Sequence, residues 1–142
     1  MAIESSGKQD EFFDELELMS VEAREKYLNQ RLSRAIDYAY RNAPAAKEIL
    51  DRAKVSPAEI RTIRDLEKLP ITRKTELIEL QRAKPPYGGF LAIPVDEVDR
   101  VFISPGPIYE PLHTGAIKWF AKSFYAAGFR KGAVCINTFT YH

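Results

Sequence analysis

The chain has 142 residues, enough for one hydrophobic core, and 45% of them are apolar, which is typical of a folded protein. Its 21 basic and 20 acidic residues leave a net charge of +1, so nothing indicates a nucleic-acid partner or an anionic membrane. The lone Cys135 excludes an internal disulfide. Because no signal peptide or membrane-spanning run is visible either, we expect a cytoplasmic protein. The two histidines, His113 and His142, lie too far apart in sequence to predict a metal site.

An acidic, irregular arm is expected over residues 1–19, followed by a helical segment over residues 20–90. Apolar residues recur at helical spacing over residues 21–42, and Ser20 is a good N-cap for this helix. Proline disfavours helix in the residue before it, so Ala43-Pro44 ends the helix. Pro44 also suits the first position of a shorter helix that ends near Ala53.

Three further short helices have explicit start signals. Ser56 with Glu59, and Thr62 with Asp65, have the spacing of capping boxes. Thr72 is expected to cap a helix over residues 73–81. Residues 84–90 (KPPYGGF) follow as a turn-rich connector.

Residues 91–142 have the rhythm of an α/β nucleotide-binding subdomain. We expect a buried strand at Val101-Phe102-Ile103, a loop over residues 104–111, a helix that Gly128 ends, and a second buried strand over residues 133–139 with Cys135 in the core. Strand, loop, helix and strand form the unit in which α/β enzymes bind nucleotide phosphates. Two strands are fewer than a stable sheet requires, so we expect the N-terminal piece of a larger α/β protein.

Several segments, in this order and spacing, resemble the N-terminus of the phenylacetate–CoA ligase family of AMP-forming, adenylate-forming ligases. They are residues 38–44 (YAYRNAP), 55–57 (VSP), 65–74 (DLEKLPITRK) and 86–98 (PYGGFLAIPVDEV). The resemblance runs from about residue 24 to the end of the chain. It implies an incomplete α/β N-terminal domain, with the rest of the ligase chain as its partner.

The resemblance also implies a two-step reaction. A carboxylic acid, aromatic or arylalkyl, attacks ATP with the help of Mg²⁺ to give an acyl-adenylate, and coenzyme A then displaces AMP. This piece by itself is expected to be inactive, because most nucleotide contacts and the coenzyme A step lie beyond residue 142 in such ligases. No catalytic residue is assigned within the chain.

The family's ATP phosphate loop corresponds to residues 104–111 (SPGPIYEP). Ser104, Gly106 and Pro111 match the family's pattern in a loop that is otherwise degenerate. The phosphate donors that remain are the Ser104 and Tyr109 side chains and the N–H groups of Gly106, Ile108 and Tyr109. This segment is less suited to binding a triphosphate than the family's loop. Its three prolines lack an N–H, and Glu110 stands where the family has a lysine. An active ligase with a divergent loop and a relative that has lost adenylation both remain open.

The family places aromatic side chains around the acid substrate in a stretch that corresponds to residues 137–142, which assigns Phe139 and Tyr141 to the acid site. The alternative is that both are core aromatics. Two other functions stay open: a non-catalytic relative that binds a ligand or serves as an assembly surface, and an adenylyltransferase that joins AMP to a deazaflavin hydroxyl. A homodimer is also open.

Overall fold

The computed structural model describes residues 11–138 and consists of two compact units. Among the described residues, one unit is 19–114, and the other combines 11–18 with 115–138. The larger unit contains most of the helices and the only sheet found among the described residues. No helix within residues 11–138 has both the length and the apolar character needed to cross a membrane.

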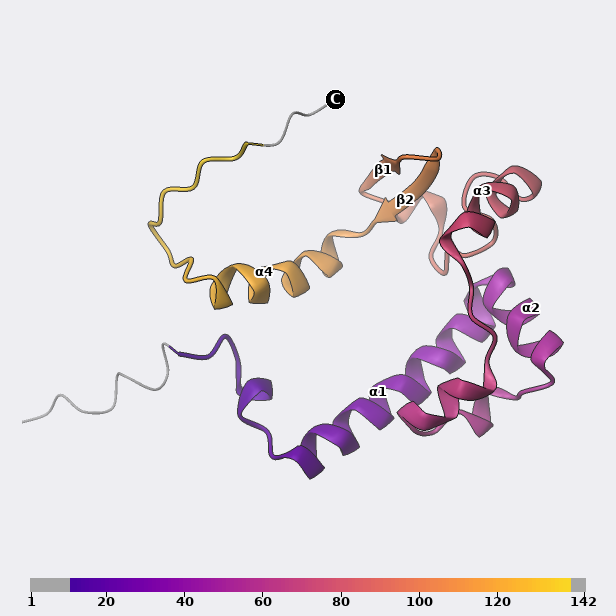
Figure 1. Ribbon diagram of the computed structural model, residues 1–142, viewed down its shortest axis with the longest axis horizontal. Helices are drawn as coiled ribbons and strands as arrows, with labels where there is room; N and C mark the ends of the chain where they lie inside the picture. Colours follow the sequence, from indigo (N-terminus) through magenta and orange to yellow (C-terminus); the bar gives the residue numbers. More distant parts are fainter. Residues whose placement is uncertain (1–10, 139–142) are drawn as a thin grey trace, which may run out of the picture. The chain divides into compact units, whose positions relative to one another are not determined.

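Two consecutive helices form the main body of the larger unit. Helix α1 (Val21–Asn42) begins where the sequence predicts, with the Ala23 N–H donating to Ser20 Oγ at 3.2 Å. Helix α2 (Pro44–Ala53) starts at its proline and packs against α1 (Figure 1). Both helices therefore have the bounds expected from their cap and proline signals.

The two capping boxes are confirmed, and each starts a short 3-10 helix. The Glu59 carboxylate accepts from the Ser56 N–H at 2.8 Å, at the start of the 3-10 helix Pro57–Glu59. The Asp65 carboxylate accepts from the Thr62 N–H at 2.8 Å, at the start of the 3-10 helix Ile63–Lys68. The third start signal is placed wrongly by one residue. Helix α3 spans Lys74–Ala83 with Arg73 as its N-cap, and the Arg73 N–H donates to the Glu76 carboxylate at 3.5 Å.

A small core holds these elements together. Its fully or nearly buried apolar residues are Ala43, Ala45, Leu50, Ile60, Tyr87 and Ile108. The connector after α3 joins this core, since the Ala45 N–H donates to the Gly89 carbonyl at 2.9 Å. Close approach of the two backbones and a φ of +79° explain the glycine at position 89, where a Cβ would lie 3.3 Å from Ala45 N.

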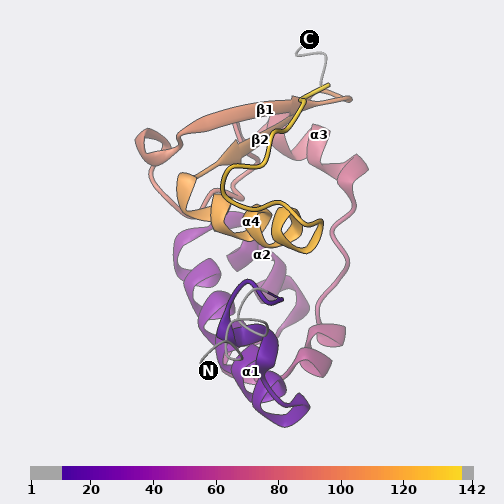
Figure 2. The same cartoon turned by 90° about the vertical axis from the view of Figure 1, so that its left-hand side faces the viewer.

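The segment predicted as a strand followed by a phosphate loop is instead an antiparallel hairpin (Figure 2). Strand β1 (Arg100–Ser104) has the expected position, but strand β2 (Ile108–Leu112) occupies most of the expected phosphate loop. The intervening turn is only residues 105–107, and Gly106, at φ +134°, permits it. The prediction that Val101-Phe102-Ile103 is buried is wrong as well, because all three are exposed in this two-stranded sheet.

The smaller unit joins part of the N-terminal arm to the last helix. Helix α4 spans Ile117–Ala126, and Gly128 follows it at φ +90°, as the sequence predicts. The Phe13 ring meets the Tyr125 ring edge to face at a centroid distance of 5.5 Å, and Lys122 Nζ lies 2.9 Å from Asp14 Oδ1. The arm residues Glu15–Leu18 form a short 3-10 helix.

The second strand predicted over residues 133–139 is wrong for the part that the structure describes. Residues 133–138 are irregular and exposed, and Cys135 is exposed rather than in a core. An apolar strand pattern needs neighbouring strands to satisfy its backbone, and within residues 11–138 no other strand pairs with this segment. Phe139, Tyr141 and His142 lie outside the described residues.

Candidate functional site

A hollow of about 550 Å³ lies beside the hairpin, between α3, the connector and β2. Its apolar lining consists of Leu77, Tyr87, Phe90, Leu91, Ile108 and Pro111, and its polar lining of Thr72, Lys74, Gln81, Tyr109 and Glu110. An apolar cavity with a few polar groups is the usual form of a small-molecule site. This hollow includes Ile108 and Tyr109 from the predicted phosphate segment, so we take it as the candidate site.

Gln81 connects α3 to the hairpin and is one of the residues that line the hollow. Its Nε2 donates to the Tyr109 carbonyl and its Oε1 accepts from the Tyr109 N–H, both at 2.9 Å. Gln81 is only 8% exposed, so both bonds are shielded from water. Lys74, Leu77 and Gln81 have the spacing i, i+3, i+7 of one helix face, which is the signal that could have placed all three at the site.

A charged pair occupies the rim. Lys74 Nζ on α3 lies 3.3 Å from Glu110 Oε1 on β2. The Ser104 hydroxyl and then the Lys74 ammonium lower the pKa of the Glu110 carboxyl from its ordinary value of 4.5. Glu110 is therefore ionised at neutral pH and offsets the positive charge of Lys74. Ser104 Oγ is buried and makes no hydrogen bond of ordinary geometry within residues 11–138, although its hydroxyl lies near enough to the Glu110 carboxylate to favour the ionised form.

The structure brings the predicted phosphate-loop residues together, but not as an anion cradle. Ser104 and Ile108 face each other as Cα partners at the closed end of the hairpin, with Gly106 in the turn. Ile108 is buried at 3% exposure, and the Tyr109 N–H is already taken by Gln81. A phosphate cradle needs several free N–H groups pointing at one anion. The arrangement seen here offers few, so the roles assigned to these four residues remain predictions.

The described residues do not fit a magnesium site. Nowhere in residues 11–138 do three or more His, Cys, Asp or Glu side chains gather closely enough to hold a metal ion. Asp and Glu carboxylates are the usual protein ligands of Mg²⁺, and Glu110 is paired with Lys74. We therefore derive no step through a metal in this part of the chain.

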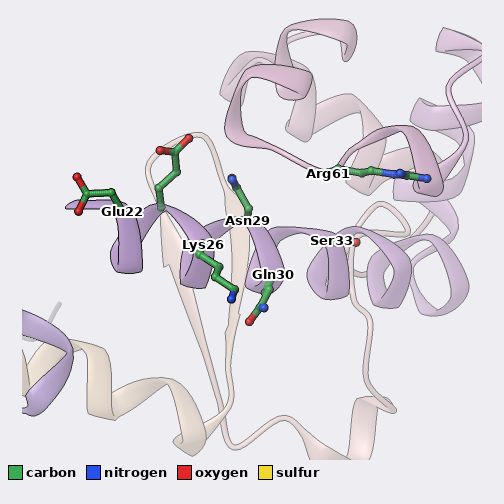
Figure 3. Close-up of a pocket in the computed structure, with 7 residues that line it drawn as sticks. Glu22, Lys26, Asn29, Gln30, Ser33 and Arg61 are labelled. Carbon is green, nitrogen blue, oxygen red and sulfur yellow. The ribbon is translucent and has the colours of Figure 1, made fainter. Parts of the chain in front are cut away.

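A second hollow, of about 560 Å³, runs along α1 and is polar (Figure 3). All of its lining residues except Arg61 lie along α1. Figure 3 shows that Lys26 and Gln30 extend to one side of this helix and Asn29 to the other. Asn29 Oδ1 accepts from the Ile63 N–H at 3.2 Å, and Arg61 Nε donates to the Ala58 carbonyl at 2.8 Å. These groups support the chain rather than converge on a ligand.

No protein-family model matches the chain. Over 135 residues it is 35% identical to the phenylacetate-coenzyme A ligase of Thermus thermophilus. This match covers 89% of the chain and 29% of that ligase. It is also 33% identical over 102 residues to the phenylacetate-coenzyme A ligase of Escherichia coli. That match covers 72% of the chain and 22% of the E. coli ligase. The chain is related to the N-terminal part of phenylacetate–CoA ligases.

Solved ligase structures agree with this relationship. A 2-hydroxyisobutyryl-CoA ligase, crystallised in the postadenylation state with 2-HIB-AMP, superposes with a TM-score of 0.74 at 27% identity. The match covers 80% of this chain and 25% of that chain. The chain thus spans less than a third of the length of these ligases, and its fold is an incomplete N-terminal portion of an adenylate-forming CoA ligase, as the sequence predicts.

Proposed function

We propose that the chain forms the N-terminal part of an ATP-dependent acid–CoA ligase acting on an aromatic or arylalkyl acid. The observation that carries this proposal is the 35% identity to a phenylacetate-coenzyme A ligase across 89% of the chain. The likeness in fold to a 2-hydroxyisobutyryl-CoA ligase crystallised with 2-HIB-AMP also supports it.

The proposed chemistry has two steps. A carboxylate oxygen of the acid attacks the α-phosphorus of ATP, and the bond to pyrophosphate breaks to leave an acyl-adenylate. The coenzyme A thiol then attacks the acyl carbonyl, the bond to AMP breaks, and a thioester forms. ATP and coenzyme A are thus substrates, and Mg²⁺ would assist the first step from a site built by other parts of the ligase.

The part played by residues 11–138 is to support the nucleotide end of the site. Gln81 holds the hairpin to α3, and we assign the hairpin turn, with Gly106 in it and Ser104 just before it, to the position of the ligases' phosphate loop. Because the prolines and Glu110 weaken phosphate binding there, we assign most of the triphosphate contacts to the remainder of the ligase.

A second candidate function is favoured by the same hairpin. Pro105, Pro107 and Pro111 offer no N–H, the Tyr109 N–H is engaged by Gln81, and Glu110 adds a negative charge. These features suit a non-catalytic relative that keeps the ligase fold and binds a ligand without adenylating it.

Pyrophosphate exchange into ATP, measured on the complete gene product with a panel of aryl and arylalkyl acids, separates the two functions. Exchange that depends on one of the acids supports the ligase. Exchange that is absent with every acid, while one of them still binds by calorimetry, supports the non-catalytic relative. A stop codon directly after His142 in the gene would contradict a complete ligase.

A further inference from the structure

Lys74 carries the positive charge of the hollow beside the hairpin. Among the described residues that line this hollow it is the one basic side chain, and it stands at the first residue of α3. The helix dipole disfavours a cation at this end, so the lysine does not stabilise its own helix. The stability of α3 therefore does not explain why a lysine occupies this position.

The ion pair with Glu110 does not explain the lysine either. Lys74 Nζ lies 3.3 Å from Glu110 Oε1, and the two side chains are 63% and 50% exposed. Exposed pairs of this kind contribute little to stability. The hairpin is held to α3 by the two shielded bonds between Gln81 and Tyr109 instead, each 2.9 Å long. Lys74 can thus exchange Glu110 for a stronger anion with little loss of stability.

The hairpin itself offers an anion few donors. The three prolines of residues 104–111 lack an N–H, and the Tyr109 N–H is engaged by Gln81. An anion bound at this hairpin therefore needs a positive charge from a neighbouring element. Lys74 supplies one, because an ammonium has three N–H donors and the bond to Glu110 uses one of them.

We propose that Lys74 contacts a phosphate oxygen of ATP in the complete ligase, and that Glu110 holds the ammonium until the nucleotide displaces it. This role rests on the ligase function proposed above and adds a binding residue outside the hairpin. A triphosphate carries several negative charges and a carboxylate carries one, so the triphosphate competes well for the same ammonium. Glu110 then opposes ATP binding in two ways, by repelling the phosphates and by occupying Lys74.

Calorimetry with ATP on the complete gene product tests the proposal through the sign of two substitutions. Lys74→Ala removes the phosphate contact and should weaken ATP binding about five- to tenfold. Glu110→Gln keeps the shape of the side chain, frees the ammonium and should tighten ATP binding about two- to fivefold. Lys74→Arg keeps the charge and should stay within about twofold of the parent protein. If the pair served only to hold the hairpin on α3, breaking it from either side would shift the affinity in the same direction.

A second ion pair, at the other end of α3, provides a matched control. Lys84, the C-cap of α3, pairs with Glu48 of α2, and the two side chains are 50% and 52% exposed. This pair also joins residues 36 apart in sequence, but neither of its members lines the hollow. About 15 Å of helix separates Lys84 from Lys74. Lys84→Ala and Glu48→Gln should therefore change ATP affinity by less than about twofold.

All four substituted positions are exposed, so the variants should fold as the parent protein does, and thermal denaturation of the same samples checks this. ATP binding by the parent protein that Lys74→Ala weakens no more than Lys84→Ala does overturns the role of Lys74 but not the proposed ligase function. Shifts of Lys74→Ala and Glu110→Gln in the same direction have the same consequence. A parent protein that binds no ATP overturns both the role of Lys74 and the ligase function.

Discussion

Gln81 satisfies both backbone groups of Tyr109, in the way that a neighbouring strand would. The two bonds, each 2.9 Å long, run between an α-helix side chain and the free edge of β2. A hairpin of two strands is only marginally stable alone, so its fixed position depends on this side chain and on the burial of Ile108. The relationship places the candidate site between α3 and the hairpin.

Replacing Gln81 should therefore loosen the hairpin. Gln81→Leu keeps the apolar volume but leaves a donor and an acceptor of Tyr109 unpaired, and should lower the free energy of unfolding by about 2 kcal/mol. Urea denaturation of the variant measures this change. Arg82→Ala, on the same helix, removes only an exposed pair with Glu79 and should change stability by less than about 0.5 kcal/mol. Equal effects of the two substitutions would contradict the role given to Gln81.

Lys54 occupies a left-handed conformation, with φ +57°, at the C-cap of α2. A residue with a Cβ is strained there, whereas glycine is not. Lys54→Gly should raise the free energy of unfolding by about 0.5–1 kcal/mol, as measured by thermal and urea denaturation. Lys54→Ala removes the long side chain but keeps a Cβ at positive φ. It therefore separates the effect of backbone strain from the effect of losing the lysine side chain. A variant with glycine that is no more stable than the one with alanine would show that φ is not the cause.

Asp65 makes stability dependent on pH. Its carboxylate accepts from Lys68 Nζ at 2.7 Å, from the Thr62 N–H at 2.8 Å and from the Arg61 N–H at 3.0 Å. The Lys68 bond, followed by those from Thr62 and Arg61, lowers the pKa of Asp65 well below its ordinary value of 3.8. A lowered folded-state pKa means that the unfolded chain binds the proton first on acidification. The stabilisation is thus complete above pH 3.8 and is lost as the pH falls further.

The variant Asp65→Asn separates the contribution of Asp65 to the pH dependence of stability from the contributions of the other carboxylates. It should be less stable than the parent chain at neutral pH, and the difference between the two should shrink as the pH falls through the lowered pKa. Unfolding free energies from pH 7 downward provide the measurement. Two curves that stay parallel to the lowest accessible pH would exclude Asp65 as the source.

The helical part of the larger unit could be predicted from sequence because its signals are local. Ser20, Pro44, and the Ser56 and Thr62 capping boxes act on backbone groups within a few residues, so the bounds of α1 and α2 were correct. The same holds for the turn that follows α4 at Gly128. Family resemblance added the fold of the parent ligase, which no local pattern contains.

The hairpin and the last strand could not be predicted, because their structure depends on distant partners. An apolar run such as Val101-Phe102-Ile103 indicates a strand but does not tell which strand pairs with it or what covers its faces. The chain reverses at Gly106, and Tyr109 finds its partner 28 residues away in Gln81. The apolar run at residues 133–138 meets no neighbouring strand within residues 11–138 and stays irregular.

The negative charge of Glu110 should oppose ATP binding if the proposed ligase function is right. Glu110 stands where the related ligases are expected to present a lysine to the triphosphate, and Lys74 lies 3.3 Å from its carboxylate. In the complete gene product, Glu110→Lys should tighten ATP binding about three- to tenfold, because it removes a repulsive charge and adds an attractive one at a half-exposed site. Isothermal calorimetry with ATP measures the change. Glu97→Lys makes the same change in net charge at an exposed residue of the 3-10 helix Val95–Glu97 and should leave ATP affinity unaltered. If Glu110→Lys has no more effect than Glu97→Lys, then Glu110 lies away from the triphosphate and the hairpin is not part of the nucleotide site.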